Sequence, residues 1–484
     1  MMSPLHQRTR MDRAVGVMVL LLAAGAALVL VAGIVLSGSG MTPDLREGVA
    51  DSLHYIWDPE VPRWGLLIGA SGLALALALA GLVTGVEHIV ATRARRAEDR
   101  GDNPLAPRVV MADTAGRFDG EVTITVCVPA HNEADRIQAT LDSLRAQDGA
   151  PERIIVVTDN CTDRTVEIAR AAGVDVFETI DNTHKKAGGL NQCLTGLLPT
   201  LGNNDCVMVM DADTVLDQGF LAEARRRLTA DRALMAVTGL FYGEDGGGLL
   251  GLCQRNEYTR YSRDIERRQG KVFVLTGTAT VFRARALRTV AQERGRLLPG
   301  TPGDVYDTAA LTEDNEMTIA LKSLGALMIS PSNCRVVTEV MTTWKALWNQ
   351  RLRWQRGALE NLGTYGLTPQ TSRYWSQQLG IGYGVLALLA YFVMMTIMAL
   401  SLAQWVWFPF WLAVGGVFAL ERVVTAWKGG WAARFLAVLV IPELIYATYL
   451  NIVFCKGCLD ILRAKQAEWT HVAADGSVVR EEKP

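Results

Sequence analysis

The sequence predicts an α/β domain, with a mixed and mostly parallel sheet covered by helices, joined to transmembrane helices and an amphipathic interfacial helix. Three observations support this fold class. The middle of the chain alternates short β-branched runs with helical spacing, and both ends carry long uncharged apolar runs. A tryptophan-containing amphipathic pattern follows the central region.

The alternation of strands and helices occupies residues 108–340 of the chain. Val122–Val128 and Ile154–Thr158 are short apolar runs, and Asn132–Arg145 between them shows helical spacing. Cys206–Met210 is a third predicted strand. Parallel sheets of this kind bind nucleotides beyond the carboxyl ends of their strands. The polar motifs described below follow these strands.

The apolar runs at both ends are long enough to cross a bilayer, which takes about 20 residues in a helix. Two spans are expected at about 14–36 and 64–86, within an N-terminal membrane region over 1–107. About three further apolar segments lie in a C-terminal membrane region over 373–457, and a polar tail follows over 458–484.

Charged residues around the first two spans predict the orientation of the chain. Arginines precede the first span and follow the second, whereas the loop between the two spans is mainly acidic. The positive-inside rule therefore predicts a multi-pass protein of the cell membrane with its central domain in the cytosol. The segment with Pro442 could cross or re-enter, which leaves the side of the C-terminal tail open.

The composition excludes some classes of function. The formal net charge is −2, and no basic stripe alternates with aromatic residues, so nucleic acid is not an expected partner. The eight cysteines are scattered, as in a protein of a reducing compartment rather than a disulfide scaffold.

Asp211 and Asp213 follow the third predicted strand. In extended chain, residues i and i+2 point the same way, so both carboxylates can face one cation. Mg²⁺ prefers oxygen ligands and is commonly shared with substrate phosphates. The alternative is a solvated loop after a strand.

Motifs after the other two strands could contact a nucleotide. Ala130 and Glu133 lie where the chain leaves the first strand, and Asp159 follows the second. Lys186 precedes a glycine pair, as a phosphate contact would. The alternatives are a plain strand-to-helix turn, an Asx turn and a solvated basic loop, respectively.

Two further motifs carry charge near the end of the central region. Glu313 and Asp314 precede an apolar helical run, and the alternative to catalysis is a helix start with acidic residues against the dipole. Gln350, Arg353 and Trp354 cluster on one face of an amphipathic helix within 341–372. That helix could equally be an ordinary interfacial anchor.

In this order, the motifs PAHNE, TDNCTD, KKAGGLN, DAD, TGT, TED and QRLRW resemble the membrane-integrated family 2 glycosyltransferases, the processive synthases of cellulose, chitin, hyaluronan and poly-N-acetylglucosamine. The resemblance implies a GT-A fold and a hexosyltransferase that needs Mg²⁺ or Mn²⁺. It implies that Asp314 is the general base and that Asp211 and Asp213 bind the metal. The implied donor-binding residues are Ala130, Glu133, Asp159, Lys186, Asp211, Gln350, Arg353 and Trp354. The implied acceptor-side residues are Thr276, Gly277, Thr278 and Glu313.

The implied reaction is an inverting transfer from a UDP-sugar, with UDP-N-acetylglucosamine or UDP-glucose as the leading donors, that makes a β-linked polysaccharide. The partners would be the donor, a growing glycan or lipid acceptor, and membrane lipid. An alternative is a single addition to a lipid or surface glycan. A transporter with a regulatory nucleotide domain is a different class, for which only Glu443 supplies a clear intramembrane charge.

The sequence departs from the family pattern in three regions. Thr158, Asn160 and Cys161 replace common residues of the base-pocket motif. The segment Arg294–Asp307 has no evident counterpart, and the predicted helix Leu249–Arg268 is unusually charged.

Overall fold

The computed structural model describes the chain over residues 122–202, 204–268, 270–400 and 422–465, with short pieces at 46–50, 53–57, 89, 104–105, 405–407, 416, 419–420, 471–472 and 478–479. The chain divides into two compact units, one with residues 1–87 and 366–466 and one with residues 88–365 and 467–484. The expected spans at 14–36 and 64–86 lie outside the described residues.

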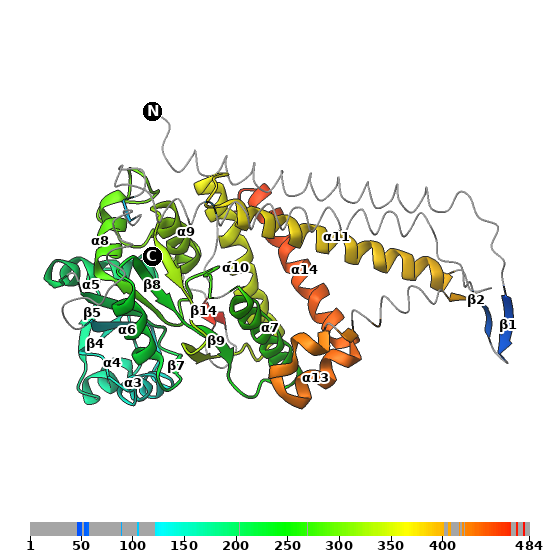
Figure 1. The fold of residues 1–484 in the computed structure, drawn as a ribbon, viewed down its shortest axis with the longest axis horizontal. Coiled ribbons are helices and arrows are strands. Elements are labelled where there is room, and N and C mark those ends of the chain that lie inside the picture. Colours follow the sequence, from blue (N-terminus) through cyan, green and yellow to red (C-terminus); the bar gives the residue numbers. More distant parts are fainter. Residues whose placement is uncertain are drawn as a thin grey trace. The chain divides into compact units, whose positions relative to one another are not determined.

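A seven-stranded sheet in the order β11-β8-β10-β6-β3-β4-β5 forms the centre of the unit that holds residues 88–365 (Figure 1). Only β10 runs antiparallel to its neighbours, and the other paired strands are parallel. The predicted mixed, mostly parallel sheet is therefore confirmed. Its strands are β3 (Thr123–Ala130), β4 (Arg153–Thr158), β5 (Asp175–Glu178), β6 (Asp205–Val209), β8 (Leu234–Thr238), β10 (Thr280–Arg283) and β11 (Leu327–Ile329).

Helices cover this sheet, and a small sheet in the order β7-β12-β9 lies in the same unit. The small sheet consists of β7 (Val215–Leu216), β12 (Arg335–Thr338) and β9 (Leu240–Gly243). The helices are α3 (Ile137–Arg145), α4 (Thr165–Ala171), α5 (Lys185–Leu197), the 3₁₀ turn η2 (Leu198–Thr200), α6 (Phe220–Ala230), α7 (Gly248–Arg267), α8 (Ala284–Glu293), α9 (Glu313–Ser323) and α10 (Trp344–Tyr365).

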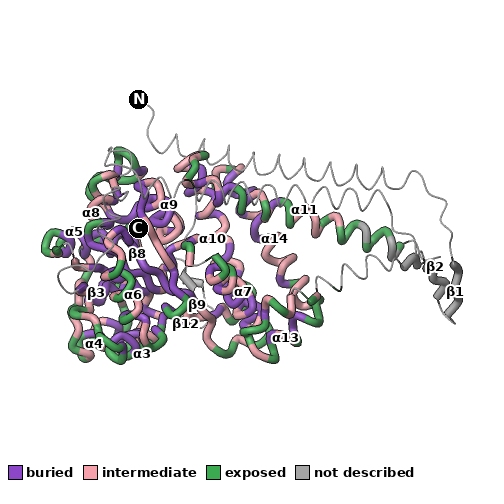
Figure 2. The backbone as a smooth tube through the Cα atoms, in the orientation of Figure 1, coloured by how far each residue is buried: buried purple, intermediate pink, exposed green. Residues whose placement is uncertain are grey.

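Two hydrophobic clusters form the core on the two faces of the sheet, and the backbone of β3 and β8 runs through mostly buried residues (Figure 2). Successive residues of β3 enter different clusters, because side chains alternate along a strand. Cys127 packs with Leu190 of α5, whereas Val126 packs with Leu141 of α3 and Leu221 of α6. This double cover fixes the strands whose ends carry the polar motifs.

The helix expected over Asn132–Arg145 begins later, at Ile137. Asn132 has a left-handed backbone, with φ of 56°, and its Oδ1 accepts a hydrogen bond from the Thr162 N–H at 2.8 Å. The chain before Ile137 is therefore held by the neighbouring loop after β4, and it forms a turn rather than helix.

The unit with residues 366–466 holds two helices long and apolar enough to cross a membrane, at Ser372–Ile397 and Ile441–Leu462. They lie in α11 (Ser372–Leu400) and α14 (Ile441–Leu462). The α14 helix continues beyond residue 457, where the polar tail was expected. Outside residues 88–365 the described residues also form β1 (Arg46–Ala50), β2 (Leu53–Trp57), β13 (Trp405–Trp407), η3 (Trp427–Gly429), α13 (Gly430–Leu439), β14 (His471–Val472) and β15 (Val478–Val479).

Pro442 marks a break between α13 and α14 in the apolar segment that was expected to cross or re-enter the membrane. Val440 has φ of 57° at the break, and Pro442 lies in the first turn of α14, where its missing N–H costs no helical hydrogen bond. The segment is therefore two helices, and only the second is long enough to span. In the same unit, β13 pairs in parallel with β2.

Candidate active site

Three parallel strands bring the nucleotide motifs to one edge of the large sheet. β3, β4 and β6 are neighbours, and their carboxyl ends lead to Ala130, Asp159 and Asp211, respectively. The Asp159 N–H donates to the Ala130 carbonyl at 2.9 Å. Parallel pairing is thus the reason that residues far apart in sequence meet here.

The Asp159 carboxylate is fixed by side chains from neighbouring loops. Its Oδ1 accepts hydrogen bonds from Thr179 Oγ1 and Asn182 Nδ2, both at 2.8 Å, and from Asn160 Nδ2 at 3.1 Å. Ala130 is buried, and its carbonyl also accepts a bond from the Cys161 thiol. These contacts hold the end of β4 rigid beside the end of β3.

Carboxylates accumulate around the end of β6. Burial, followed by the charges of Asp211 and Glu339, raises the pKa of Asp213 to about 6. Burial, followed by Asp213 and Glu339, raises the pKa of Glu133 to about 8. These acidic side chains therefore face one region, where their mutual repulsion favours a cation.

Lys186, at the start of α5, lies between two acidic motifs. Its Nζ is 2.7 Å from Asp211 Oδ1 and 3.0 Å from Glu313 Oε1. Burial alone would lower the pKa of Lys186, but Asp211 and Glu313 raise it well above its usual value. The lysine is therefore a fixed cation in the site, and the alternative of a solvated basic loop is excluded.

Gly277 is the point where three of the predicted side chains converge. A Cβ atom at this position would lie 3.0 Å from Lys186 Nζ, 3.2 Å from Asp211 Oδ2 and 3.6 Å from Asp314 Oδ2. The Gly277 N–H also donates to Asp314 Oδ2 at 3.3 Å. The absence of a side chain at Gly277 keeps this space open.

Glu313 and Asp314 start α9 and differ in their titration. Burial, and then the charge of Glu313, raise the pKa of Asp314 to about 6. Burial also opposes ionisation of Glu313, but Lys186 and Arg353 outweigh it, so its pKa is lowered. One carboxylate is thus held charged beside a cation, while its neighbour is poised to take a proton.

Threonine hydroxyls shape the loop that holds Gly277. The Thr276 N–H donates to Thr238 Oγ1 at 3.0 Å, and the Thr278 hydroxyl donates to Thr276 Oγ1 at 2.9 Å. Thr238 also shares a hydrogen bond with Thr280 at 2.8 Å. The network fixes the backbone that approaches Asp314.

The helix α10 packs on the start of α9. A Cβ on Gly357 would lie 2.5 Å from Thr312 Oγ1, and Asn361 Nδ2 donates to Asn315 Oδ1 at 3.0 Å. Arg353 on the same helix lowers the pKa of Glu313, so its charge reaches the site.

The other two predicted residues of α10 differ in their surroundings. Gln350 Oε1 is buried without a hydrogen-bond partner among the described residues. The Trp354 ring lies 4.3 Å from the guanidinium carbon of Arg351, which also pairs with Glu257 at 2.9 Å. The helix α10 therefore carries the buried amide of Gln350, the guanidinium of Arg353 and the Trp354 ring, which packs against Arg351.

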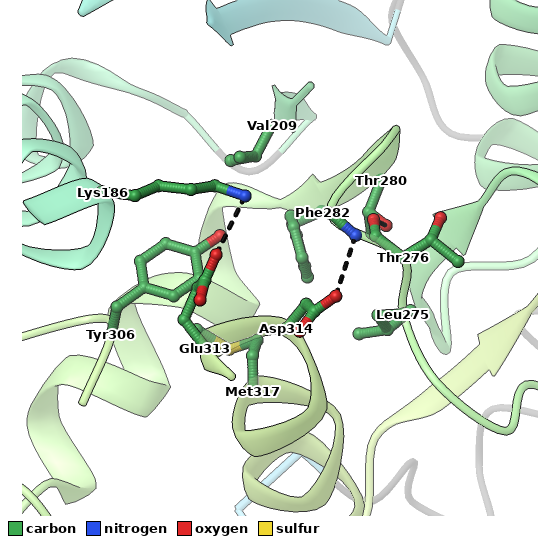
Figure 3. Close-up of a pocket in the computed structure, with 11 residues that line it drawn as sticks. Lys186, Val209, Leu275, Thr276, Thr280, Phe282, Tyr306, Glu313, Asp314 and Met317 are labelled. Atoms are coloured by element: carbon green, nitrogen blue, oxygen red, sulfur yellow. Dashed lines mark hydrogen bonds and ion pairs between the residues drawn. The ribbon is translucent and has the colours of Figure 1, made fainter. Parts of the chain in front are cut away.

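A small cavity lies beside these groups (Figure 3). Lys186, Glu313 and Asp314 form its polar side, and Gly277 borders it. The remaining lining residues are Val209, Leu275, Thr276, Thr280, Phe282, Tyr306 and Met317.

Asp211 and Asp213 carry carboxylate oxygens of the kind that a divalent cation prefers. Glu133 and Glu339 lie close enough to add negative charge around this pair. Among the described residues no group of three or more His, Cys, Asp and Glu side chains is placed to hold a metal. A hard cation bound to the carboxylate oxygens of Asp211 and Asp213 would need phosphate and water as its other ligands.

Several residues of this region were missed by sequence reasoning. Glu339 follows β12 and adds to the acidic cluster, and Tyr306 lines the cavity. Arg294 forms a buried pair with Glu316 of α9. Only the extra length of Arg294–Asp307 signalled that this segment was unusual.

Comparison with known proteins gives one family match. Residues 125–291 match the model described as Glycosyl transferase family 2. The poly-β-1,6-N-acetyl-D-glucosamine synthase of Staphylococcus aureus strain MW2 is 28% identical over 245 residues, which cover 49% of this chain and 55% of that protein. The enzyme of the same name from Staphylococcus epidermidis is 26% identical over the same length. The chain thus spans about half the length of these curated relatives.

Similar solved structures include two transferases. A mannosyltransferase from Pyrobaculum calidifontis, in complex with GDP-Man and Mn²⁺, is 19% identical and covers 81% of this chain and 99% of its own, with a TM-score of 0.46. Glucosyl-3-phosphoglycerate synthase from Mycobacterium tuberculosis, in complex with Mn²⁺, UDP and phosphoglyceric acid, is 20% identical and covers 54% of this chain and 82% of its own, with a TM-score of 0.35.

Proposed function

We propose that this chain, whose residues 125–291 match the Glycosyl transferase family 2 model, is a family 2 glycosyltransferase that transfers a sugar from a UDP-sugar, with inversion, to build a β-linked polysaccharide at a membrane. The observation that carries the proposal is the convergence of Lys186, Asp211 and Asp314 within 4 Å of one point beside Gly277. A cation, a metal-type carboxylate and a carboxylate with a raised pKa are the groups that such a transfer needs.

Asp314 is the general base of the proposed reaction. Its pKa of about 6 leaves it ionised near neutral pH, yet basic enough to accept a proton. It takes the proton of the acceptor hydroxyl, and that oxygen attacks the anomeric carbon from the face opposite the diphosphate. An α-linked donor then gives a β-linkage.

The diphosphate side of the donor faces positive charge. Asp211 and Asp213 would hold Mg²⁺ or Mn²⁺, which neutralises the charge that develops on the leaving diphosphate. Lys186 and Arg353 supply further positive charge in the same region. Ala130, Glu133 and Asp159 are proposed to bind the nucleoside.

We propose a GT-A fold for the catalytic unit and an acceptor-binding side formed by the Gly277 loop and the starts of α9 and α10. Thr276, Gly277, Thr278 and Glu313 border the region where the acceptor hydroxyl would approach Asp314. Gln350 and Trp354 lie on α10, which packs against the start of α9. The buried and unpartnered Gln350 Oε1 supports a contact with substrate.

The sugar and the product are inferred from the relatives. The relatives are named as synthases of poly-β-1,6-N-acetyl-D-glucosamine. This supports N-acetylglucosamine as the leading sugar and a polymer as the product. The two long apolar helices of the other unit support a membrane location.

Replacement of Asp314 by asparagine tests the base assignment. In purified full-length protein, Asp314→Asn is expected to lower UDP release at least 1,000-fold and to leave UDP affinity within about threefold, because the base acts only in the chemical step. Asp245→Asn is the control, because Asp245 is an exposed carboxylate. Turnover by Asp314→Asn at the rate of this control would remove the assignment.

Product size tests the polymer assignment. Separation of labelled products by length is expected to give long chains rather than a single added sugar. A product one sugar longer than the acceptor would instead indicate single addition.

A further inference from the structure

The segment Arg294–Asp307 is fixed to both helices that carry the candidate active site. It lies between α8 and α9 and contains two core residues, Leu298 and Val305, which are each 2% exposed. Gly300 has φ of 109°, and a Cβ there would lie 3.1 Å from Arg294 Cδ. The segment is therefore tightly folded rather than a loose surface loop.

Arg294 attaches the segment to α9. Its guanidinium forms a two-point pair with Glu316, with Nη2 2.8 Å from Oε2, and both side chains are at most 1% exposed. It also donates to the Pro299 and Val305 carbonyls at 2.9 and 2.8 Å. One buried arginine thus joins the segment's backbone to the helix that starts with Asp314.

Asn191 attaches the segment to α5, the helix that presents Lys186. Its Oδ1 accepts from the Val305 and Tyr306 N–H groups at 3.1 and 2.8 Å. Its Nδ2 donates to the Tyr306 carbonyl at 2.9 Å. Both backbone groups of Tyr306 are therefore bound to one amide, which fixes the direction of its side chain.

The Tyr306 side chain points into the cavity beside Lys186 and Glu313 (Figure 3). The residue is 3% exposed, and its hydroxyl makes no hydrogen bond to any residue that the structure describes. Burial raises the pKa of Tyr306, so the hydroxyl stays protonated and able to donate. The hydroxyl oxygen is not among the fully buried polar atoms that lack a partner in the described part of the chain, so it borders the open space of the cavity, where a ligand oxygen can accept its hydrogen bond.

We propose that Tyr306 is a substrate-contacting residue whose phenol hydroxyl donates a hydrogen bond to an oxygen of the hexose unit bound beside Asp314. The proposal rests on the proposed glycosyl transfer. It gives Arg294–Asp307 a role in sugar specificity, since the segment holds this donor at one place in the cavity. A sugar that lacks an oxygen at that place is bound less well.

Tyr306→Phe tests the contact in the full-length protein, with Tyr365→Phe as the matched control. The Tyr365 hydroxyl donates to the buried Glu316 carboxylate, and Tyr365 does not line the cavity. Each variant loses one hydroxyl from the same region. The control therefore measures the effect of a structural hydroxyl.

The two variants are expected to affect different quantities: Tyr306→Phe lowers kcat/KM, and Tyr365→Phe lowers Tm. Tyr306→Phe lowers kcat/KM for the UDP-sugar or for the acceptor roughly three- to tenfold, with UDP affinity unchanged and an equal or higher Tm. Tyr365→Phe lowers Tm and leaves KM unchanged. Whether the KM for the UDP-sugar or the KM for an acceptor oligosaccharide rises shows which hexose is contacted.

Two outcomes overturn the proposal while leaving the proposed transfer intact. One is parental kcat/KM for both substrates in Tyr306→Phe. The other is a loss of Tm in Tyr306→Phe as large as in Tyr365→Phe, which would show that the hydroxyl is structural. Failure of the unmodified protein to release UDP from any UDP-sugar would instead overturn the proposed function itself.

Discussion

Replacement of Arg294 by methionine is expected to destabilise the catalytic unit strongly. The change keeps most of the aliphatic stem but removes the guanidinium that pairs with Glu316 and bonds the Pro299 and Val305 carbonyls. Glu316 would remain buried, with the Tyr365 hydroxyl still donating a hydrogen bond to it. An uncompensated carboxylate in that position is unfavourable.

The size of the effect follows from burial. Removing one partner of a buried ion pair costs about 3–5 kcal/mol. In a unit of this size each kcal/mol lowers the melting temperature by about 2–4 °C, so the midpoint is expected to fall by roughly 6–20 °C. Arg294→Met combined with Glu316→Gln should recover part of the loss, because the buried charge is then absent.

Thermal unfolding of the detergent-solubilised full chain, at one heating rate, measures the effect. Arg296→Met is the control, since the Arg296 side chain is 75% exposed and lies 3.7 Å from Glu293. Such a surface pair contributes at most about 1 kcal/mol. A midpoint for Arg294→Met within about 2 °C of that control would refute the reasoning.

Further predictions concern the site. Gly277→Ala should lower UDP release at least tenfold, because the new Cβ would lie 3.0 Å from Lys186 Nζ. Gly196→Ala is the control and should retain activity, because its Cβ would meet nothing within 4 Å, and equal rates for the two variants would refute the steric argument. UDP release should fall about tenfold per pH unit below the Asp314 pKa of about 6, as the base becomes protonated. The pKa of Asp314 is raised from 3.8 to about 6, so its ionisation costs the folded state about 3 kcal/mol, and stability is lost as pH rises from about 4 through 6. Asp314→Asn should therefore raise the melting temperature near neutral pH but not near pH 4, and an unchanged difference between the two would contradict this assignment.

The clustering of the strand motifs could be predicted from the sequence for a physical reason, whereas the family came from the resemblance of the ordered motifs. The carboxyl ends of parallel strands meet at one edge, so motifs after predicted strands are brought together whatever their separation in the chain. Asp159 and Asp211 follow β4 and β6 in this way. The resemblance to family 2 glycosyltransferases is confirmed by the family match over residues 125–291.

Long-range side-chain pairing could not be predicted. Arg294 lies in a polar, glycine-containing segment that reads as a surface loop, yet it is fully buried against Glu316. No sequence pattern indicates that these two residues pair, because a single buried arginine leaves no periodic signal in the sequence around it. For the same reason the cavity position of Tyr306, which depends on both Arg294 and Asn191, was missed.

Local patterns also misplaced one boundary. The helical spacing of Asn132–Arg145 gave no indication that the first residues bind the loop after β4 instead of continuing the helix. Asn132 accepts its bond from Thr162, a residue 30 positions away. Tertiary hydrogen bonds decided where α3 begins.

UDP release from UDP-N-acetylglucosamine by the full-length protein in lipid nanodiscs, with and without divalent cation, tests the central claim most directly. The account predicts turnover with Mg²⁺ or Mn²⁺, loss with a chelator, recovery when the cation is restored, and loss in Asp213→Asn but not in Asp245→Asn. Undiminished turnover in the chelator, or in Asp213→Asn, would contradict it.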